Sequence, residues 1–208
     1  MTETDPSLPS RCSWCGDDPL YVDYHDSIWG RPVASSRELF AKLCLDGQQA
    51  GLSWITVLRK QKNYEQLFFG FDPEKIITLT DADIETLMQN PGIIRNRLKV
   101  NSIIRNARAY LAMRDRGMAF NRFIWQFVDG EPVQNEWRTL SEVPVNTPRS
   151  DAMSIALKKQ GFNFVGSTIC YAFMQAVGLV NDHLTGCHCH EACRTEGQAF
   201  TIDTRPNN

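Results

Sequence analysis

The thiol and imidazole side chains of this chain gather near its two ends. Three of its four histidines lie in segment 183–190, which also holds Cys187 and Cys189, and the fourth, His25, follows Cys12 and Cys15. This pattern indicates that one metal ion ties the two ends together. Zinc takes four such ligands tetrahedrally, and a zinc site filled by protein ligands is usually structural. The fold must therefore bring both ends of the chain together, and we expect the chemistry to lie elsewhere.

The spacing of these residues leaves the ligand set open. A four-cysteine site is allowed, and so is a mixed set of thiols and imidazoles, because His183 and Cys187 lie about one helical turn apart. The alternative is a group of surface histidines and free thiols without a metal. The candidate ligands are Cys12, Cys15, His25, His183, Cys187, His188, Cys189, His190 and Cys193.

Length and composition narrow the class of protein. A chain of 208 residues predicts one domain or two closely packed ones, and a net charge of -2 with a pI near 6.1 predicts no overall attraction to nucleic acid. The N-terminal segment is polar and no apolar run approaches the ~20 residues of a membrane span. We therefore expect a cytoplasmic protein without a membrane partner. A reducing compartment disfavours disulfides, so its seven cysteines are expected to be metal ligands or buried thiols.

Helical periodicity runs through most of the chain. Ser35 and Glu38 have the spacing of a capping box, and Asp72-Pro73 is typical of a helix start. We find no alternation typical of strands over a useful length. The fold class is therefore predicted to be all-α, with loops at both ends and loose tails at 1–10 and 195–208. The predicted helices include 80–89, 95–113, 120–128, 150–160 and 166–177.

A short acidic helix, the turn Asn90-Pro91-Gly92 and a basic helix follow one another in the middle of the chain. The turn amides and the N-terminus of the second helix, with the cations Arg95, Arg97 and Lys99, could grip a phosphate backbone without reading its sequence. The alternative is an ordinary helix pair with a solvated, charged face.

A carboxylate and aromatic residues form a third group. Asp46 lies in the last turns of the helix that begins near Ser35, where the macrodipole disfavours a negative charge, and Trp54 follows it. Rings beside a carboxylate suit a flat, cationic or amino-bearing ligand such as a modified purine. The alternative is that the rings are core residues and Asp46 is solvated. The aromatic residues that precede this helix are Trp14, Tyr21, Tyr24 and Trp29.

Several long blocks together resemble one family. RCSWCGDDPLYVDYHDSIWG, LDGQQAGLSWITVLRK, PGIIRNRLKVNSIIRNARAYL and GFNFVGSTICYAFMQAVGLVNDH are similar to the bacterial DNA-3-methyladenine glycosylases of type I, which belong to the helix-hairpin-helix glycosylase superfamily. The resemblance runs from about residue 11 to 190. It implies a single catalytic unit that flips 3-methyladenine out of double-stranded alkylated DNA and removes it by hydrolysis. We expect the protein to act as a monomer.

The resemblance also implies roles for particular residues. It assigns one structural Zn²⁺ to Cys12, His25, His183 and Cys187, and it assigns the methylated base to Trp14, Tyr21, Tyr24 and Trp54, with Asp46 as the catalytic, base-recognising acid. It further assigns DNA contacts to Gly51, Leu52, Gly92, Arg95, Arg97 and Lys99.

One position departs from the family pattern. The family most often has Glu where this chain has Asp46, so the carboxylate reaches less far by one methylene. Two other classes of function are alternatives to this interpretation. A zinc-stabilised DNA- or protein-binding module would release no base, and a zinc-dependent nucleobase deaminase would need an H-x-E…P-C-x-x-C signature, which this sequence lacks.

Overall fold

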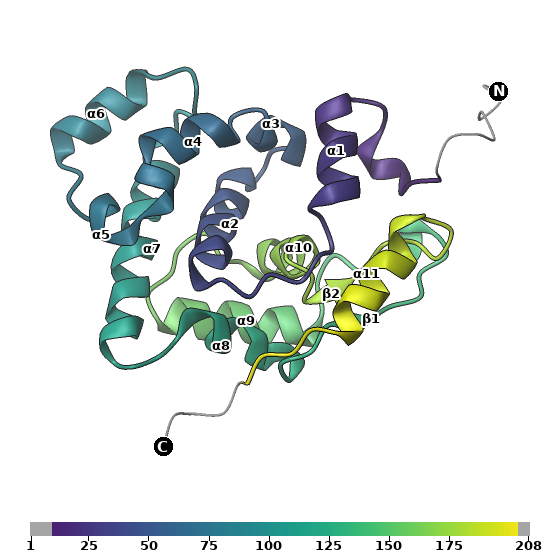
Figure 1. Cartoon of the computed structure of the whole chain (residues 1–208). Helices are drawn as coiled ribbons and strands as arrows, with labels where there is room; N and C mark the ends of the chain where they lie inside the picture. Colours follow the sequence, from purple (N-terminus) through teal and green to yellow (C-terminus); the bar gives the residue numbers. More distant parts are fainter. Residues whose placement is uncertain (1–9, 204–208) are drawn as a thin grey trace.

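The computed structural model describes residues 10–203, and within them the fold is helical, as the sequence predicts (Figure 1). The α-helices are α1 Pro19–Ser27, α2 Ser36–Gln49, α3 Trp54–Leu58, α4 Gln61–Leu67, α5 Pro73–Ile76, α6 Asp81–Gln89, α7 Arg97–Asp115, α8 Phe120–Trp125, α9 Pro148–Lys159, α10 Ser167–Ala176 and α11 Cys189–Gln198. Short 3₁₀ turns are η1 Ser13–Cys15, η2 Phe69–Phe71, η3 Gln126–Val128 and η4 Leu140–Glu142. Two strands, β1 Val133–Gln134 and β2 Val180–Asn181, complete the fold.

Local chemistry explains where many of these helices begin. The side chain of Asp18 accepts hydrogen bonds from the amides of Leu20 and Tyr21 at the start of α1, and Pro19 occupies the first turn. Thr80 and Asp83 form a reciprocal capping box at the start of α6. These caps satisfy amide groups that would otherwise have no partner inside the helix.

The core lies around α2 and α10. α2 packs against α7, α8 and α10, and α9 packs on α10 (Figure 1). Large side chains from many elements are fully buried there, which gives the molecule one main hydrophobic core. The largest of them are Trp125, Tyr64, Phe40, Phe68, Phe71 and Phe173.

The ends of the described chain differ from the predicted loops. α1 and α11 are helices that the sequence analysis missed, because α1 has no clear apolar stripe and the buried face of α11 consists of Cys189, His190, Cys193 and Gly197 in place of large apolar side chains. α11 lies against the two-stranded parallel sheet, where Asn181 Nδ2 donates a hydrogen bond to the carbonyl of His190. The predicted loose tail from residue 195 is wrong as far as residue 203. α11 continues to Gln198, and the ring of Phe200 lies 4.4 Å from that of Trp125. The rest of both predicted tails, 1–9 and 204–208, lies outside the described residues.

The two ends of the chain meet, as the distribution of histidine and cysteine predicts. The amide of His188 donates to the carbonyl of Ser10, and the amide of Leu184 donates to the thiol sulfur of Cys12. Figure 1 shows α1 and α11 on the same side of the molecule. Among residues 10–203, no helix combines the length and the apolar character that crossing a bilayer requires.

One glycine decides how the segment between α1 and α2 packs on the end of α10. Gly178 has a φ of +71°, and a Cβ at this position would lie 2.5 Å from the nitrogen of Pro32 and 2.7 Å from the carbonyl oxygen of Arg31. Gly117 has a similar φ of +76°, but a Cβ there would meet nothing within 4 Å. The two glycines share one backbone conformation and differ in the space around it.

We expect Gly178→Ala to destabilise the protein much more than Gly117→Ala. Both substitutions force alanine into the left-handed region at about 1–2 kcal/mol, and only Gly178→Ala adds a backbone clash of roughly 1–3 kcal/mol or more. Urea unfolding of both variants measures the difference. Equal losses of stability would show that the close approach of 31–32 to Gly178 is wrong.

Candidate functional site

A buried cluster of two thiols and two imidazoles joins the ends of the chain. The side chains of Cys12, His25, His183 and Cys187 are all buried, and their ligand atoms lie within 4.8 Å of one another. His183 Nδ1 is 3.7 Å from Cys12 Sγ and 3.5 Å from Cys187 Sγ, and His25 Nε2 is 3.5 Å from Cys187 Sγ. A tetrahedral zinc ion with ordinary Zn–S and Zn–N bonds separates sulfur and nitrogen by about 3.6 Å. The four residues therefore have the geometry of a site that could hold a metal ion.

The outer nitrogens of both rings are held by the protein. His25 Nδ1 donates to Asp26 Oδ1 at 2.7 Å, and His183 Nε2 donates to the carbonyl of Trp29 at 3.1 Å. Each ring thus turns its unprotonated nitrogen toward the thiols, as metal-binding histidines do. The Arg11 guanidinium, by its hydrogen bonds, lowers the pKa of Asp26 to about 2, which keeps this carboxylate charged beside His25.

The other candidate ligands lie outside this group of four. His190 Nε2 is 3.0 Å from the carbonyl of Asn135, and His188 Nδ1 is 2.9 Å from that of Ser10. Cys15 points its thiol at the carbonyl of Cys12. Cys189 makes smaller groupings with its neighbours, such as Cys187 and His188. The mixed set of two cysteines and two histidines is thus the one that the fold assembles completely, and the four-cysteine alternative is not assembled.

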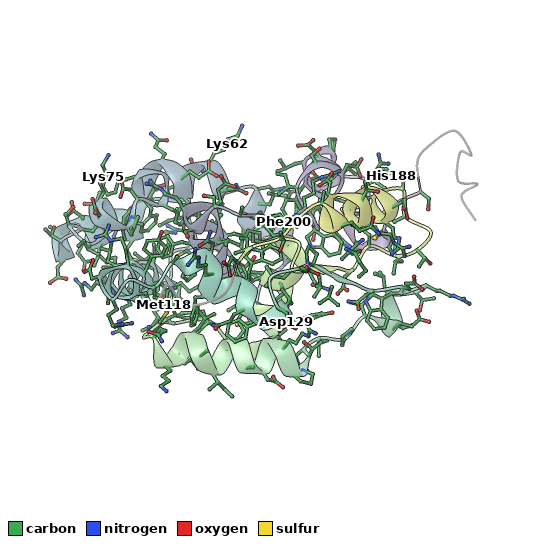
Figure 2. All side chains as sticks on the ribbon, turned by 60° about the horizontal axis from the view of Figure 1, so that its bottom comes forward. Lys62, Lys75, Met118, Asp129, His188 and Phe200 are labelled. Carbon is green, nitrogen blue, oxygen red and sulfur yellow. The ribbon has the colours of Figure 1, made fainter. Side chains whose placement is uncertain are left out.

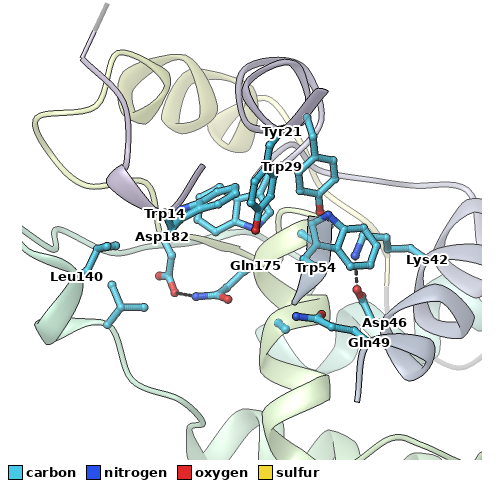
Figure 3. Close-up of a pocket in the computed structure, with 14 residues that line it drawn as sticks. Trp14, Tyr21, Trp29, Lys42, Asp46, Gln49, Trp54, Leu140, Gln175 and Asp182 are labelled. Atoms are coloured by element: carbon cyan, nitrogen blue, oxygen red, sulfur yellow. Dashed lines mark hydrogen bonds and ion pairs between the residues drawn. The ribbon is translucent and has the colours of Figure 1, made fainter. Parts of the chain in front are cut away.

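A cavity of about 190 Å³ opens beside this cluster (Figure 3). Aromatic side chains from η1, α1 and α3 line one side, and polar side chains from α2 and α10 line another. The predicted base-binding residues Trp14, Tyr21, Tyr24, Asp46 and Trp54 all lie in its lining. The lining also contains Trp29, Lys42, Gln49, Leu140, Val143, Ala172, Gln175, Ala176 and Asp182.

The rings of this cavity contact one another in a continuous chain. The rings of Tyr24 and Trp54 lie 5.4 Å apart, and the ring of Trp14 lies 5.1 Å from Tyr21 and 4.9 Å from Trp29. Tyr24 and Trp54 are buried, whereas Trp14 and Tyr21 are half-buried. The alternative that these rings are only core residues is therefore incomplete. The rings pack on the core, and they also form the wall of a cavity.

Asp46 is buried, and one of its oxygens has no partner. Its Oδ1 accepts a hydrogen bond from the ammonium of Lys42, one helical turn earlier on α2. Its Oδ2 and the indole nitrogen of Trp54 are both buried without a hydrogen-bond partner. Burial raises the pKa of Asp46, and the Lys42 ammonium opposes that rise. The alternative of a solvated Asp46 is thus wrong, since only 1% of the residue is exposed.

A second buried carboxylate forms the opposite side of the cavity. Asp182 Oδ1 accepts from Asn135 Nδ2 at 2.7 Å and from Trp137 Nε1 at 2.9 Å. Its Oδ2 accepts from the hydroxyl of Tyr171 at 2.6 Å and from Gln175 Nε2 at 2.8 Å. Four donors from two parts of the chain, the segment 135–137 and α10, therefore meet on one side chain. In contrast to Asp46, both oxygens of Asp182 are satisfied.

The basic hairpin forms as predicted, as α6, a turn at 90–94 and α7. Arg95 is exposed beyond the turn, and Arg97 is exposed but paired with Glu85. The predicted DNA contact of Lys99 is not supported, because this side chain is buried and its ammonium donates to the carbonyls of Gln48 and Ala50. Lys99 instead holds the end of α2 onto α7.

The turn amides of the hairpin are partly occupied. The amide of Gly92 donates to the side chain of Asn90 at 2.7 Å, and the amide of Ile94 donates to the hydroxyl of Tyr64 at 3.0 Å. These two groups hold the turn together and are not free for a phosphate. The other predicted contact lies between α2 and α3, where Leu52 is 41% exposed and Gly51 has a φ of +75°. A glycine there permits the turn that presents Leu52 to solvent.

Sequence reasoning missed part of the lining. Lys42 lies one turn before Asp46 on α2 and Gln49 lies one turn after it, on the same face, and this spacing could have found them. Asp182 directly precedes the ligand candidate His183, yet a single acidic residue gave no signal by itself. Gln175 gave none either, because it lies on a helix that otherwise reads as core.

Comparison with known proteins gives consistent results. Residues 14–190 match the family described as methyladenine glycosylase. DNA-3-methyladenine glycosylase 1 of Escherichia coli (strain K12) is 56% identical over 180 residues, which cover 86% of this chain and 96% of that protein. A crystal structure of 3-methyladenine DNA glycosylase I superimposes with a TM-score of 0.86 at 57% identity and covers 87% of this chain and 100% of that chain.

A more distant relative carries information about a ligand. The structure that describes 3-methyladenine recognition by the Staphylococcus aureus glycosylase is 36% identical, with a TM-score of 0.84, and covers 86% of this chain and 96% of that chain.

The geometry around Asp182 generates a prediction about stability. Asp182→Asn replaces one acceptor oxygen by an amino group that faces donors, so we expect it to reduce the free energy of unfolding by about 3 kcal/mol. Tyr171→Phe removes a single donor and should cost only about 1–2 kcal/mol. Denaturant unfolding measures both. Unchanged stability of Asp182→Asn would refute the four-donor arrangement.

Proposed function

Because this chain belongs to the methyladenine glycosylase family, we propose that it removes 3-methyladenine from alkylated DNA in base-excision repair. The observation that carries this proposal is the pair of unpartnered polar atoms in an aromatic cavity, Asp46 Oδ2 and Trp54 Nε1. Buried polar groups are almost always hydrogen-bonded, so an acceptor and a donor left open beside aromatic rings indicate a ligand that supplies both. The amino group and ring nitrogens of a purine do so.

Charge gives the site its preference for a methylated base. Methylation at N3 puts a positive charge on the purine within DNA, and that charge is attracted to the carboxylate of Asp46 and to the faces of the aromatic rings. An unmodified adenine lacks this charge and therefore gains less binding energy from the carboxylate and the rings. The cost of unstacking, a few kcal/mol, is lowest for a damaged base, which adds to the selectivity.

The reaction then needs little acid catalysis. The positively charged purine is a good leaving group, so its glycosidic bond is already weakened. Asp46 accepts a hydrogen bond from the edge of the base, while the aromatic wall that contains Tyr24 and Trp54 contacts the base. Water attacks the anomeric carbon of the sugar as the base departs. Catalysis in this scheme comes from binding and charge stabilisation of the departing base.

We propose that double-stranded DNA lies across the surface that carries Leu52 and the α6–α7 turn. Leu52 is an exposed apolar side chain beside the cavity-lining helices, suited to fill the space that a flipped nucleotide leaves. Arg95 is an exposed cation beyond the turn and suits a phosphate contact. A helix-hairpin-helix mode of binding, a monomeric state and a cytoplasmic location stay predictions.

We also propose that the ion held by Cys12, His25, His183 and Cys187 is zinc. Two thiols and two imidazoles whose ligand atoms lie within 4.8 Å of one another suit the tetrahedral coordination of this metal, and oriented outer nitrogens are typical of its histidine ligands. All four positions are protein ligands, so no position is left for a reacting water. The zinc would therefore join the ends of the chain.

Replacing the charge of Asp46 tests the proposed base recognition. We expect Asp46→Asn to reduce the kcat/KM for release of 3-methyladenine from methylated DNA by roughly tenfold to hundredfold, the range for a lost hydrogen bond to a charged group. Asp46→Glu keeps the charge and should retain clearly more activity than Asp46→Asn. Release is measured by chromatography of the freed base. Full activity of Asp46→Asn, or no release by the unaltered protein, would contradict the proposal.

Metal analysis tests the proposed zinc site. The purified protein should contain about one zinc per chain, and Cys187→Ser should lower both the zinc content and the thermal stability, because binding energy of a structural metal contributes to folding. Cys170→Ser is the matched control, since Cys170 is a buried thiol outside the cluster. Equal zinc contents in the two variants would exclude Cys187 as a ligand.

A further inference from the structure

Lys42 is a mostly buried cation in the wall of the base cavity. Its side chain is only 14% exposed. The ammonium donates to Asp46 Oδ1 and lies 3.9 Å from the centre of the Trp54 ring (Figure 3). Burial lowers the pKa of Lys42, and Asp46 opposes this change. The lysine is thus held in place by one carboxylate and one aromatic ring.

These are two of the contacts that the proposed function gives to the cationic base. A positively charged purine gains from the carboxylate of Asp46 and from a ring face of Trp54. Lys42 already makes both contacts within the protein. A charge of the same sign as the substrate therefore occupies part of its recognition site.

We propose that Lys42 is a specificity-determining residue, an internal competitor whose ammonium must be displaced from Asp46 and Trp54 before a cationic purine binds fully. This inference rests on the proposed function and concerns the selectivity of the same site. While Lys42 stays in place, its charge neutralises that of Asp46. A cationic purine then gains less binding energy from the cavity than it would gain from an unpaired carboxylate. The lysine then narrows the difference in affinity between charged and neutral purines.

The structure contains an alternative position for the ammonium group of Lys42. Lys42 lines the base cavity and also a second cavity of about 430 Å³. Glu38 and Glu65 line this second cavity, and Glu38 lies one turn before Lys42 on α2. A lysine has a flexible four-carbon stem, so its ammonium can exchange one carboxylate for another by rotation about side-chain bonds. Displacement of the Lys42 ammonium from Asp46 therefore does not leave this ammonium buried without a carboxylate partner.

Two small ligands that differ in charge separate this inference from a structural role. The cation 3,9-dimethyladeninium carries a fixed positive charge, and 9-methyladenine is a neutral purine of similar shape. Their affinities for the full chain are measured by quenching of tryptophan fluorescence at mildly alkaline pH, because burial raises the pKa of Asp46 and an alkaline pH favours its ionised form. The quantity compared is the ratio of the two affinities, which a general loss of stability or of cavity shape would not raise.

We expect Lys42→Met and Lys42→Gln each to raise this ratio in favour of the cation by roughly tenfold, because a repelling charge a few ångströms away is removed. Lys42→Arg keeps the charge and should leave the ratio near that of the unaltered protein. Lys75→Met is the control for net charge, since Lys75 is exposed on α5 (Figure 2). Lys75→Met should leave the ratio of the two affinities unchanged.

The outcomes are distinguishable. An unchanged or lowered ratio in folded Lys42→Met overturns the inference, and if that variant does not fold, the same result in Lys42→Gln overturns it. Either result leaves the proposed function intact, provided that the unaltered protein still releases 3-methyladenine from methylated DNA. Failure of that release, together with no binding of either purine, would reject the proposed function itself.

Discussion

The junction between the two ends of the chain is the constraint on which the candidate site depends. His25 belongs to α1, the same helix that carries Tyr21 and Tyr24 into the cavity wall, and it meets Cys187 and His183 from the other end. The ring of Trp14 lies 5.2 Å from that of His25, and the ring of Trp29 lies 4.6 Å from that of His183. The aromatic wall therefore rests directly on the cluster of thiols and imidazoles. The junction acts together with the ion pair between Asp18 and Arg59 and the contact between the rings of Tyr24 and Trp54, which hold α1 against α3.

Two buried carboxylates in the same cavity have different surroundings, and this difference explains their separate roles. Asp182 is saturated by four donors and joins α10, the segment after β1 and the strand β2 into one rigid side. Asp46 keeps one oxygen open and has one cationic neighbour. A satisfied carboxylate stabilises the shape of a site, whereas an unsatisfied one remains available to a ligand.

The basic hairpin shows how a surface motif can also serve the core. Lys99 comes from the predicted DNA-binding segment but turns inward and binds the carbonyls at the end of α2, where the unpaired carbonyl groups of a helix need donors. Those carbonyls precede Gly51 and Leu52, so Lys99 fixes the start of the exposed turn. A residue predicted to contact DNA thus positions another segment predicted to do so.

The sequence by itself determined the helical class, the meeting of the two ends and a group of aromatic residues with Asp46, because helical period, cap chemistry and metal-ligand chemistry are local or depend on residue type. The resemblance to a family predicted four metal ligands, and the fold brings these four residues together. Only the tertiary structure decided that Lys42 and Asp182 share the cavity, that Lys99 is buried, and that α1 and α11 are helices. Those outcomes depend on contacts between residues far apart in the chain, such as Gln48 with Lys99 and Asn135 with Asp182. No local pattern records such contacts, since a charged side chain has the same sequence signature whether it faces water or a buried partner.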